Sequence, residues 1–497
     1  MKIKTNVGMV VSGHKEATKA GMKILKLGGN AMDAAIAAAS TLAVAIPNMN
    51  GLGGDSIALW YDAKKKRISV INGSGKSPNK ATRKYFLSKG LKKIPQRGSL
   101  SISIPGAVHA WEVALKKYGT KKFNIILKDS IKLSKEGIKI DKYLKNFLES
   151  KMYKRLIKNN KNLSEIYGSN KKVKINSKIK QSKLSKTLLE ISKHGSKVFY
   201  DGKISKILIS DIKKKGSIIT NSDFKNHRTL IQTPISVNYL NKKIFTAPPN
   251  SQGLALIKLC EAFKKKNKKS KLIDIDYYLK SKKKAFELRD TFCIDPSLIN
   301  LSKKKLNEIE TKSSYQKKIN GDTSTLVVID KHGNAVSWVQ SLFEPFGSGV
   351  VSHNTGVVLH NRLYLEKISG KYKNFLKPNK RPFHTLCPCI VLDNKKIDLT
   401  IATPGDHGQA QTIFQIINFI YNNKYSLKKS INIPRLRHDN GNLILIEKGY
   451  QKFFKKTKKT KIKVFKNKNR IFGGVTAIKV NSNKTLARGA DNRRNCV

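Results

Sequence analysis

Apolar residues near the N-terminus recur with the spacing of two consecutive helices. Between residues 16 and 27 they return every three or four positions, and the Gly-Gly pair at 28–29 supplies a left-handed stop. Asn30 can cap a second helix, because Asp33 follows three positions later and residues 34–39 are mostly alanine. Such small side chains allow close burial, so we expect two helices packed over a sheet.

Later stretches show the short apolar runs and turn residues of strands and hairpins. A polar break separates residues 57–61 from 68–71, and Asp330-Lys-His-Gly-Asn334 is a turn between two further runs. Pro105-Gly106 favours a turn between a strand and a helix. We therefore predict strands over residues 57–61, 68–71, 102–104, 326–329 and 335–339, and a helix over 108–118.

The middle of the chain differs in composition and in hydrophobic pattern. Residues 121 to about 320 are rich in lysine and mostly helical in pattern, and we interpret the lysine runs at 264–266, 282–284 and 303–305 as solvated faces and loops. The 497 residues allow up to three domains or one large layered unit. Helices, then hairpins, then helices again favour a layered sandwich with helices outside sheets.

The charge of the chain is extreme, with 100 Lys and Arg against 32 Asp and Glu and a formal net charge of +68. Taken alone, this charge suggests a nucleic acid or an anionic membrane as partner. The excess is mostly lysine, however, and it is spread along the chain beside many Asn and Ile residues. We favour a residue-usage bias of the whole proteome and keep a polyanion partner as the alternative.

Cysteine usage and the N-terminus favour a cytoplasmic location. The five cysteines are too few and too scattered for a disulfide framework, and Cys387-Pro-Cys389 lacks the spacer of redox or zinc pairs. The N-terminus has no apolar segment of a secretory signal, and the longest apolar stretch, residues 31–46, contains polar residues and is too short to span a bilayer. We expect reduced thiols and no membrane partner.

Familiar catalytic motifs are missing, since the sequence has no Walker loop, no dinucleotide-binding glycine motif, no nucleophile elbow and no His-x-x-x-His pair. Three separate segments nevertheless contain candidate catalytic residues. Thr323 heads a strand, Ser341 ends the returning strand, and the Thr-Pro-Gly-Asp-His-Gly turn at 403–408 could meet both at one site. A threonine at a strand start is ordinarily structural, so spacing alone does not establish such a site.

The chain nevertheless resembles the γ-glutamyltranspeptidase family along nearly its whole length. The most telling matches are Gly321-Asp322-Thr323, Phe346-Gly-Ser-Gly-Val-Val351 and Pro404-Gly405, which occur in the family's order and at its spacing. Further matches are residues 8–14, 28–35, 53–54, 105–108, 219–223, 233–236, 247–253, 288–290, 295–296, 355–356, 380–382 and 447–449.

The resemblance implies an N-terminal-nucleophile hydrolase of the α+β class, with a four-layer αββα sandwich. Members of the family are made as inactive chains whose threonine attacks the preceding peptide bond, which here is Asp322-Thr323. The expected fragments, residues 1–322 and 323–497, stay associated in one intertwined sandwich. Thr323 then supplies a hydroxyl nucleophile and an α-amino group with a pKa near ~8 as its base, so neither a cofactor nor a metal is expected.

The resemblance also assigns the groups around the nucleophile. Ser341 stands where the family usually has threonine, and its hydroxyl can still form a hydrogen bond near Thr323. Gly405 and Asp406 fall on a Gly-Gly pair whose backbone N–H groups stabilise the oxyanion. The alternative for Ser341 and Asp406 is a purely structural role.

Departures from the family concentrate where a γ-glutamyl group would bind. The arginine that holds the glutamate α-carboxylate is replaced by Ser74, the acidic residue for the amine by Leu365, and an asparagine near the nucleophile by Phe343. The family's paired serines are replaced by His384-Thr385. This pattern is similar to the amidohydrolase-like and acylase-like branch.

Several side chains near these departures are candidate ligands for a carboxylate or a polarised carbonyl. They could equally be surface or packing residues. The candidates are Arg362, His384, Thr385, Lys76 and His407.

These features favour an amide hydrolase or acyltransferase that forms an acyl-Thr323 intermediate with a small-molecule amide and passes the acyl group to water or an amine. We expect γ-glutamyl compounds to be poor substrates, because both ends of their head group lose a partner, and a small amide such as an oxamate held by Arg362 or Lys76 to be better. One alternative is an authentic γ-glutamyltransferase or glutathione hydrolase with a rebuilt glutamate site. The other is a non-catalytic polyanion-binding protein, although we expect any nucleic-acid binding to be non-specific and sensitive to salt.

Overall fold

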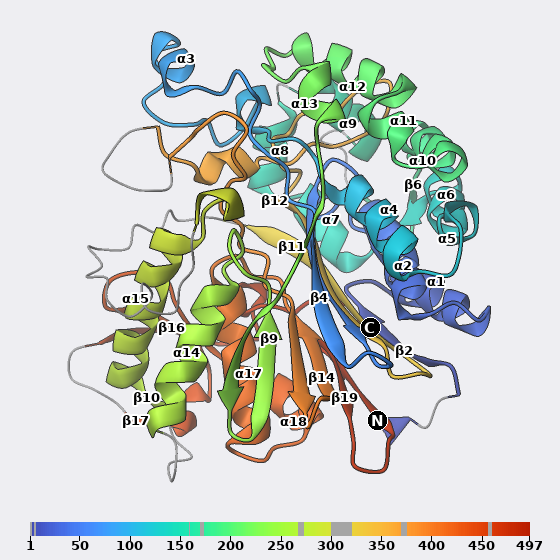
Figure 1. The fold of residues 1–497 in the computed structure, drawn as a ribbon. Coiled ribbons are helices and arrows are strands. Elements are labelled where there is room, and N and C mark those ends of the chain that lie inside the picture. The colour runs from blue at the N-terminus through green and yellow to red at the C-terminus, as the bar shows by residue number, and fades with distance from the viewer. Residues whose placement is uncertain are drawn as a thin grey trace.

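Two antiparallel sheets lie face to face at the centre of the molecule (Figure 1). The structure is a computed structural model that describes residues 2–3, 6–158, 160–168, 173–266, 273–299, 321–368, 375–455 and 460–497. The six-stranded sheet has the order β2 (Gly8–Ser12), β11 (Asp322–Asp330), β12 (Ala335–Phe343), β3 (Asp55–Asp62), β4 (Arg67–Asn72), β7 (Leu230–Gln232). The seven-stranded sheet has the order β1 (Lys2–Ile3), β20 (Leu486–Ala490), β19 (Thr476–Val480), β14 (Lys396–Ala402), β13 (Cys389–Asp393), β9 (Lys242–Thr246), β8 (Ile235–Tyr239).

Helices cover the outer faces of both sheets, on opposite sides of the molecule (Figure 1). The helices on the side of the six-stranded sheet are α1 (Lys15–Lys26), α2 (Ala31–Ala45), α4 (Ala107–Tyr118), α5 (Phe123–Ile126), α6 (Lys128–Glu136), α7 (Lys142–Leu148), α8 (Lys151–Ile157), α9 (Lys161–Tyr167), α10 (Ser182–His194), α11 (Lys197–Tyr200), α12 (Lys203–Lys213) and α13 (Asn221–Lys225). The helices on the other side are α14 (Gly253–Lys266), α15 (Ile275–Phe292), α17 (Gly408–Tyr421) and α18 (Leu427–Asn432), and α3 (Arg83–Ser88) belongs to a small separate cluster. Short peripheral strands are β5 (Ile138–Lys139) with β6 (Lys178–Ile179), β10 (Ile273–Asp274) with β17 (Phe454–Lys455), and β15 (Leu436–His438) with β16 (Leu443–Glu447) and β18 (Lys461–Phe465).

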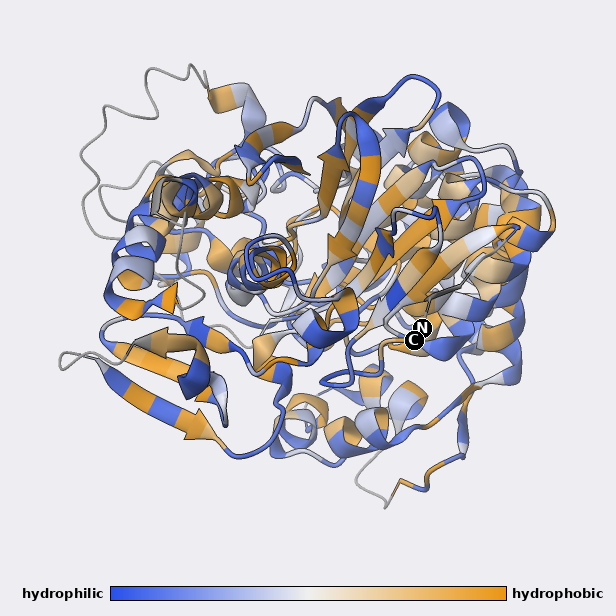
Figure 2. Cartoon of the chain, turned by 90° about the horizontal axis from the view of Figure 1, so that it is seen from below, coloured by the Kyte–Doolittle hydropathy of each residue, from blue (hydrophilic) through white to orange (hydrophobic). Residues whose placement is uncertain are grey.

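Apolar residues of both sheets meet in the layer between them. Val327 and Val339 of the six-stranded sheet belong to the same buried cluster as Ile390 and Ile478 of the seven-stranded sheet. Every residue of β11 and β12 is buried, as expected for strands that are covered on both faces. Figure 2 shows mostly hydrophobic residues along the central strands and a mixture of hydrophobic and hydrophilic residues on the surrounding helices. The expected four-layer αββα sandwich of the α+β class is therefore confirmed, and its interior contains the start of β11.

The N-terminal helices and both hairpins form as predicted. Asn30 caps α2 by accepting hydrogen bonds from the backbone N–H groups of Met32 and Asp33, and the Asp33 carboxylate accepts from the backbone N–H of Asn30. β3 pairs with β4, and β11 pairs with β12, both antiparallel. Of the described residues, none belongs to a helix that is both long and apolar enough to cross a membrane.

The predicted strand over residues 102–104 is wrong. This segment follows a short 3₁₀ turn, Ser99–Ser101, and its polar backbone groups bond to separate loops instead of to a neighbouring strand. The N–H of Ile104 donates to the Lys76 carbonyl, and the Ser103 carbonyl bonds to the His360 ring. A short apolar run looks the same in sequence whether it lies in a strand or in a buried loop.

One of the lysine runs is also not wholly solvated. Lys283 and Lys284 are exposed, but Lys282 is only 2% exposed, with its ammonium 4.1 Å from the Phe286 ring centre and donating to the Asp439 carbonyl. Position 282 lies on the face of α15 that packs inward. A run of three lysines does not show in sequence which of its members is buried. The run at 303–305 lies outside the described residues.

Candidate active site

A β-bulge places Ser341 opposite Thr323. Asp322 pairs with Phe343 and Ser324 pairs with Gln340, so β12 has one more residue than β11 between these pairs. A bulge re-aims side chains without ending the sheet. The other neighbour of β12 is β3, in which Asp55 lies directly opposite Ser341.

The Ser341 hydroxyl connects Thr323 to the peptide bond before it. The Thr323 hydroxyl donates to Ser341 Oγ at 3.2 Å, and Ser341 Oγ donates to the Asp322 carbonyl oxygen at 2.7 Å. The backbone N–H of Phe343 donates to the same Oγ at 2.7 Å, which fixes its orientation. All of these groups are buried. The Thr323 hydroxyl, the Ser341 hydroxyl and the Asp322 carbonyl thus form one hydrogen-bonded series at the Asp322-Thr323 bond.

The Asp322 carboxylate is held by three side chains that sequence reasoning missed. Arg494 Nη1 donates to Oδ1, the Tyr143 hydroxyl donates to Oδ2 at 2.8 Å, and Arg470 Nη1 lies 3.8 Å from Oδ2. Burial, helped by the Asp322 charge, raises the pKa of the Tyr143 hydroxyl, so it stays protonated and donates. Burial by itself lowers the pKa of Arg494, but its interactions with Asp322 and Tyr143 together outweigh burial and raise it.

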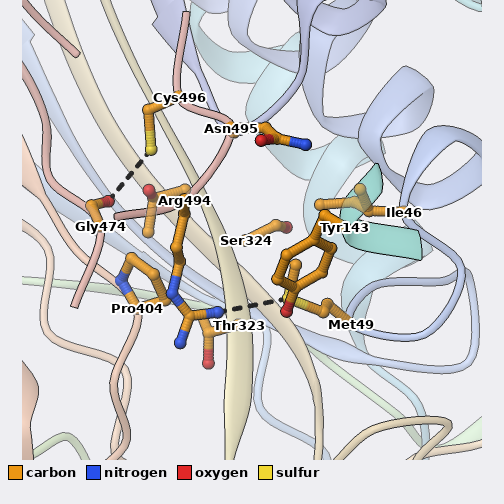
Figure 3. Close-up of a pocket in the computed structure, with 12 residues that line it drawn as sticks. Ile46, Met49, Tyr143, Thr323, Ser324, Pro404, Gly474, Arg494, Asn495 and Cys496 are labelled. Carbon is orange, nitrogen blue, oxygen red and sulfur yellow. Dashed lines mark hydrogen bonds between the residues drawn. The ribbon is translucent and has the colours of Figure 1, made fainter. Parts of the chain in front are cut away.

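A small cavity of about 20 Å³ adjoins this arrangement. Figure 3 shows Thr323, Arg494 and Tyr143 among its lining residues, with Met49 between the arginine and the tyrosine. Met49 Sδ lies 3.5 Å from Arg494 Nη1 and 3.4 Å from the Tyr143 hydroxyl. Pro404, from the turn assigned to the oxyanion, lines the same cavity.

The turn at 403–408 packs against Gly321, the residue before Asp322. A Cβ atom on Gly321 would lie 2.8 Å from Asp406 Cβ, so only a glycine allows this approach. Gly405 has a φ of +124° and Asp406 a φ of +49°, both in the region that favours glycine. Arg437 holds the turn by donating to the Gly405 carbonyl at 3.2 Å and to Asp406 Oδ1 at 2.7 Å.

Asp406 is buried, and burial raises the pKa of its carboxyl to about 6 although Arg437 opposes the rise. Its backbone carbonyl accepts from the Gln252 side chain at 2.7 Å. His407 is buried beside it, with Nδ1 3.0 Å from Arg289 Nη1 and its ring stacked near Phe383. Both residues therefore support the shape of the turn.

Arg362, His384 and Thr385 lie together behind Phe343. The Arg362 guanidinium is 4.4 Å from the Phe343 ring centre, and its Nη1 is 3.4 Å from the Thr385 hydroxyl. All of these side chains are buried, and Nε and Nη2 of Arg362 have no hydrogen-bond partner among the described residues. Burial lowers the pKa of Arg362 to about 10, so it remains a cation at neutral pH.

Asp55 balances the charge of this group. Its Oδ2 lies 3.0 Å from His384 Nε2 and 3.9 Å from Arg362 Nε. His360 Nδ1 lies 3.4 Å from the same oxygen. Burial lowers the pKa of His384 well below its usual range and that of His360 to about 4, so both rings are neutral. Asp55 and His360 are further residues that the sequence reasoning missed.

Lys76 does not join these groups. It is exposed and lines a separate cavity of about 290 Å³ with Ser77, Asp223 and His227. This cavity shares no lining residue with the one beside Thr323. Within the described ranges, no group of three or more His, Cys, Asp or Glu side chains could hold a metal ion.

Comparisons with known proteins agree with this geometry. The sequence profile described as Gamma-glutamyltranspeptidase matches residues 17–497. The "Glutathione hydrolase-like YwrD proenzyme" of Bacillus subtilis is 33% identical over 447 residues, which cover 86% of this chain and 84% of that protein. The "Oxamate amidohydrolase proenzyme" of Klebsiella pneumoniae is 28% identical over 454 residues, with 86% and 84% coverage.

A solved structure extends the similarity to three dimensions. Cephalosporin acylase from Bacillus halodurans has a TM-score of 0.89 to this structure, with 25% sequence identity over 100% of this chain and 96% of that chain. The fold is that of the N-terminal-nucleophile hydrolases. The chain belongs to the γ-glutamyltranspeptidase family.

Proposed function

We propose that the protein cleaves its own Asp322-Thr323 bond and then uses Thr323 to hydrolyse or transfer the acyl group of a small amide. The observation that carries this proposal is the hydrogen-bonded series from the Thr323 hydroxyl through Ser341 to the Asp322 carbonyl. Membership of a family of amide-cleaving enzymes supports it. Several relatives are named proenzymes, and a self-cleaving junction is consistent with that word.

Self-cleavage begins when the Thr323 hydroxyl adds to the Asp322 carbonyl carbon. Ser341 accepts the hydroxyl proton and donates its own to the carbonyl oxygen, which stabilises the developing negative charge. The proton on this oxygen then passes to the Thr323 nitrogen as the carbonyl re-forms and the C–N bond breaks, so the nitrogen leaves as an amine and an ester replaces the amide. Water hydrolyses this ester, which frees the α-carboxylate of Asp322 and the Thr323 hydroxyl.

The mature enzyme repeats this chemistry on another molecule. The freed amine of Thr323 takes the proton from its own hydroxyl as that oxygen attacks the substrate amide, and the proton passes to the leaving amine. Backbone N–H groups of the Gly405-Asp406 turn stabilise the oxyanion, an effect worth ~2.7–4 kcal/mol per donor in other acyl-transfer enzymes. Water or an amine then takes the acyl group from Thr323.

The proposed substrate has no γ-glutamyl head group, because a serine hydroxyl occupies the position of the family's arginine. Ser74 Oγ donates to Asn72 Oδ1 at 2.7 Å and is buried, so it brings no cation to the site. The buried Arg362 has two nitrogen atoms without a hydrogen-bond partner among the described residues. It packs against the ring of Phe343, whose backbone N–H donates to Ser341. A small amide that also carries a carboxylate fits this charge better than a zwitterion does. An authentic glutathione hydrolase with a rebuilt site is the second candidate.

Replacement of the nucleophile tests the proposal. Thr323→Ala should give a single uncleaved chain without amidase activity, whereas Ser324→Ala, which removes the neighbouring hydroxyl, should still be cleaved. The ratio of kcat/KM for a γ-glutamyl anilide to that for small acyl amides then decides between the two candidate substrates. A preference for γ-glutamyl over every other acyl group would favour the glutathione hydrolase.

A further inference from the structure

We infer that Arg494, Tyr143 and Arg470 form a carboxylate pocket that Asp322 fills before cleavage and that the acyl part of a substrate fills afterwards. The preferred substrates are then amides whose acyl group has the shape of Asp322. This inference rests on the proposed function, since it takes the Asp322-Thr323 bond as the first amide that Thr323 attacks.

The pocket is a built anion site. The Asp322 carboxylate is 1% exposed, and both of its oxygens accept hydrogen bonds, from Arg494 and from the Tyr143 hydroxyl. Arg470 adds a second cation 3.8 Å away and donates to the Tyr143 hydroxyl at 3.0 Å. Arg494 is itself only 7% exposed. Two arginine cations exceed what one carboxylate needs for charge neutralisation, and the phenol adds a hydrogen bond.

Cleavage allows a second molecule to occupy this pocket. Asp322 becomes a chain end that no covalent bond ties to Thr323, so another molecule can displace it. A buried guanidinium without its carboxylate is costly, so the pocket favours refilling by a second carboxylate over remaining unpaired. The replacement must also place an amide carbonyl at Thr323, because the Arg494 and Thr323 side chains line one cavity (Figure 3).

The chemistry of Asp322 sets the spacing between the two groups. Two carbon atoms, Cα and Cβ, separate the carbonyl carbon that Thr323 attacks from the carboxylate carbon that Arg494 binds. Succinamate, the monoamide of a four-carbon diacid, has the same spacing. Oxamate has no intervening carbon and glutaramate has three, so neither can match both groups in the same way. Butyramide has the length of succinamate without its charge, which makes it the matched neutral control.

The wild-type enzyme tests the inference, once mass spectrometry has shown that it is cleaved. The kcat/KM for succinamate should exceed those for butyramide, oxamate and glutaramate at least tenfold. In Arg494→Met the succinamate-to-butyramide ratio should fall towards one, mainly through a higher KM for succinamate. In Lys466→Met, which removes an exposed charge from the segment that carries Arg470, the ratio should stay as in the wild type.

Failure of the inference and failure of the proposed function can be told apart. If Arg494→Met is not cleaved, Arg470→Met takes its place, with a smaller fall of the same ratio expected because its contact is longer. A cleaved wild type without a preference for succinamate, or without activity on the whole panel, overturns the pocket and leaves Thr323 as the nucleophile. A wild type that is not cleaved overturns the proposed function and the inference together.

Discussion

Ser341 is the residue through which β12 acts on the bond before Thr323. Its hydroxyl is held by the Phe343 N–H and contacts both the Thr323 hydroxyl and the Asp322 carbonyl, the two groups that react in the proposed self-cleavage. Alanine at this position would leave both groups without their shared partner. Threonine would restore the hydroxyl at the cost of one extra methyl group in a buried bulge.

Ser341→Ala should therefore slow self-cleavage about 10²-fold to 10³-fold, the usual effect of one lost donor to a developing oxyanion. Ser341→Thr should recover most of the rate. The fraction of intact chain, followed over time after synthesis, measures this rate. Equal rates for the wild type and Ser341→Ala would remove Ser341 from the mechanism.

Asp406 makes the turn at 403–408, which we propose to bind the oxyanion, sensitive to pH. Because burial raises the pKa of its carboxyl to about 6, the ion pair with Arg437 is complete only above about pH 6. The folded pKa lies above the ordinary value near ~3.9, so ionisation of Asp406 lowers the free energy of unfolding as the pH rises between these values. The ion pair with Arg437 orders the turn, whereas the burial of the ionised carboxylate costs stability.

We expect kcat of the mature enzyme to fall as the pH drops through about 6, because protonated Asp406 releases its hold on Arg437. Asp406→Asn should lack this acid limb and have a low kcat throughout. A pH series of kcat for both proteins, corrected for the titration of the Thr323 amine at higher pH, measures the effect. An identical acid limb in Asp406→Asn would assign it to another group.

At the scale of elements, the sequence pattern predicts the helices and hairpins that local interactions stabilise. The helices of residues 15–45 and the hairpin of β11 and β12 form where caps, turns and periodicity placed them. The strand over 102–104 does not form, because the bonding of its backbone depends on loops far away in the chain.

The same distinction explains which site residues the sequence could predict. Thr323, Ser341 and the Gly405-Asp406 turn are assigned through the resemblance to the family, and the structure brings them close together. Arg494 and Tyr143 are 172 and 179 positions away from Asp322 and belong to no local motif. Their role follows only from the fold, as does the separation of Lys76 from the site.

Helix α15 contains the clearest conflict between composition and packing. Lys282 is buried, and burial lowers its pKa to about 7, well below the ordinary value near ~10.4. The unfolded chain thus binds a proton that the folded chain releases between these values, so this lysine makes stability rise with pH from about 7 to about 10.

Lys282→Met should reduce that rise and should stabilise the protein most at pH 7 and below, where the buried charge costs most. The midpoint of thermal unfolding at pH 7, 8 and 9 gives the comparison. Lys283→Met, which removes an exposed charge, is the matched control. A parallel pH dependence of the wild type and Lys282→Met would contradict the burial of this ammonium.

At the scale of the whole molecule, both sheets combine segments from either side of the Asp322-Thr323 bond. β11 and β12 pair with β2 and β3, and β13 pairs with β9. The layer between the sheets also mixes both segments. Cleavage of one peptide bond removes none of these contacts.

The two fragments should therefore elute together in gel filtration without denaturant and separate in guanidinium chloride. Neither fragment contains all the strands of either central sheet, so each fragment alone should fail to refold when the denaturant is removed, whereas the mixture should recover the sandwich. Independent elution of the fragments under native conditions would contradict the shared sandwich.

The most direct test of the account is the intact mass of the purified protein. We predict two polypeptides, residues 1–322 and 323–497, in the wild type, with threonine at the start of the second, and one chain in Thr323→Ala. A wild type that consists of a single uncleaved chain and still has full amidase activity would contradict the central role of Thr323.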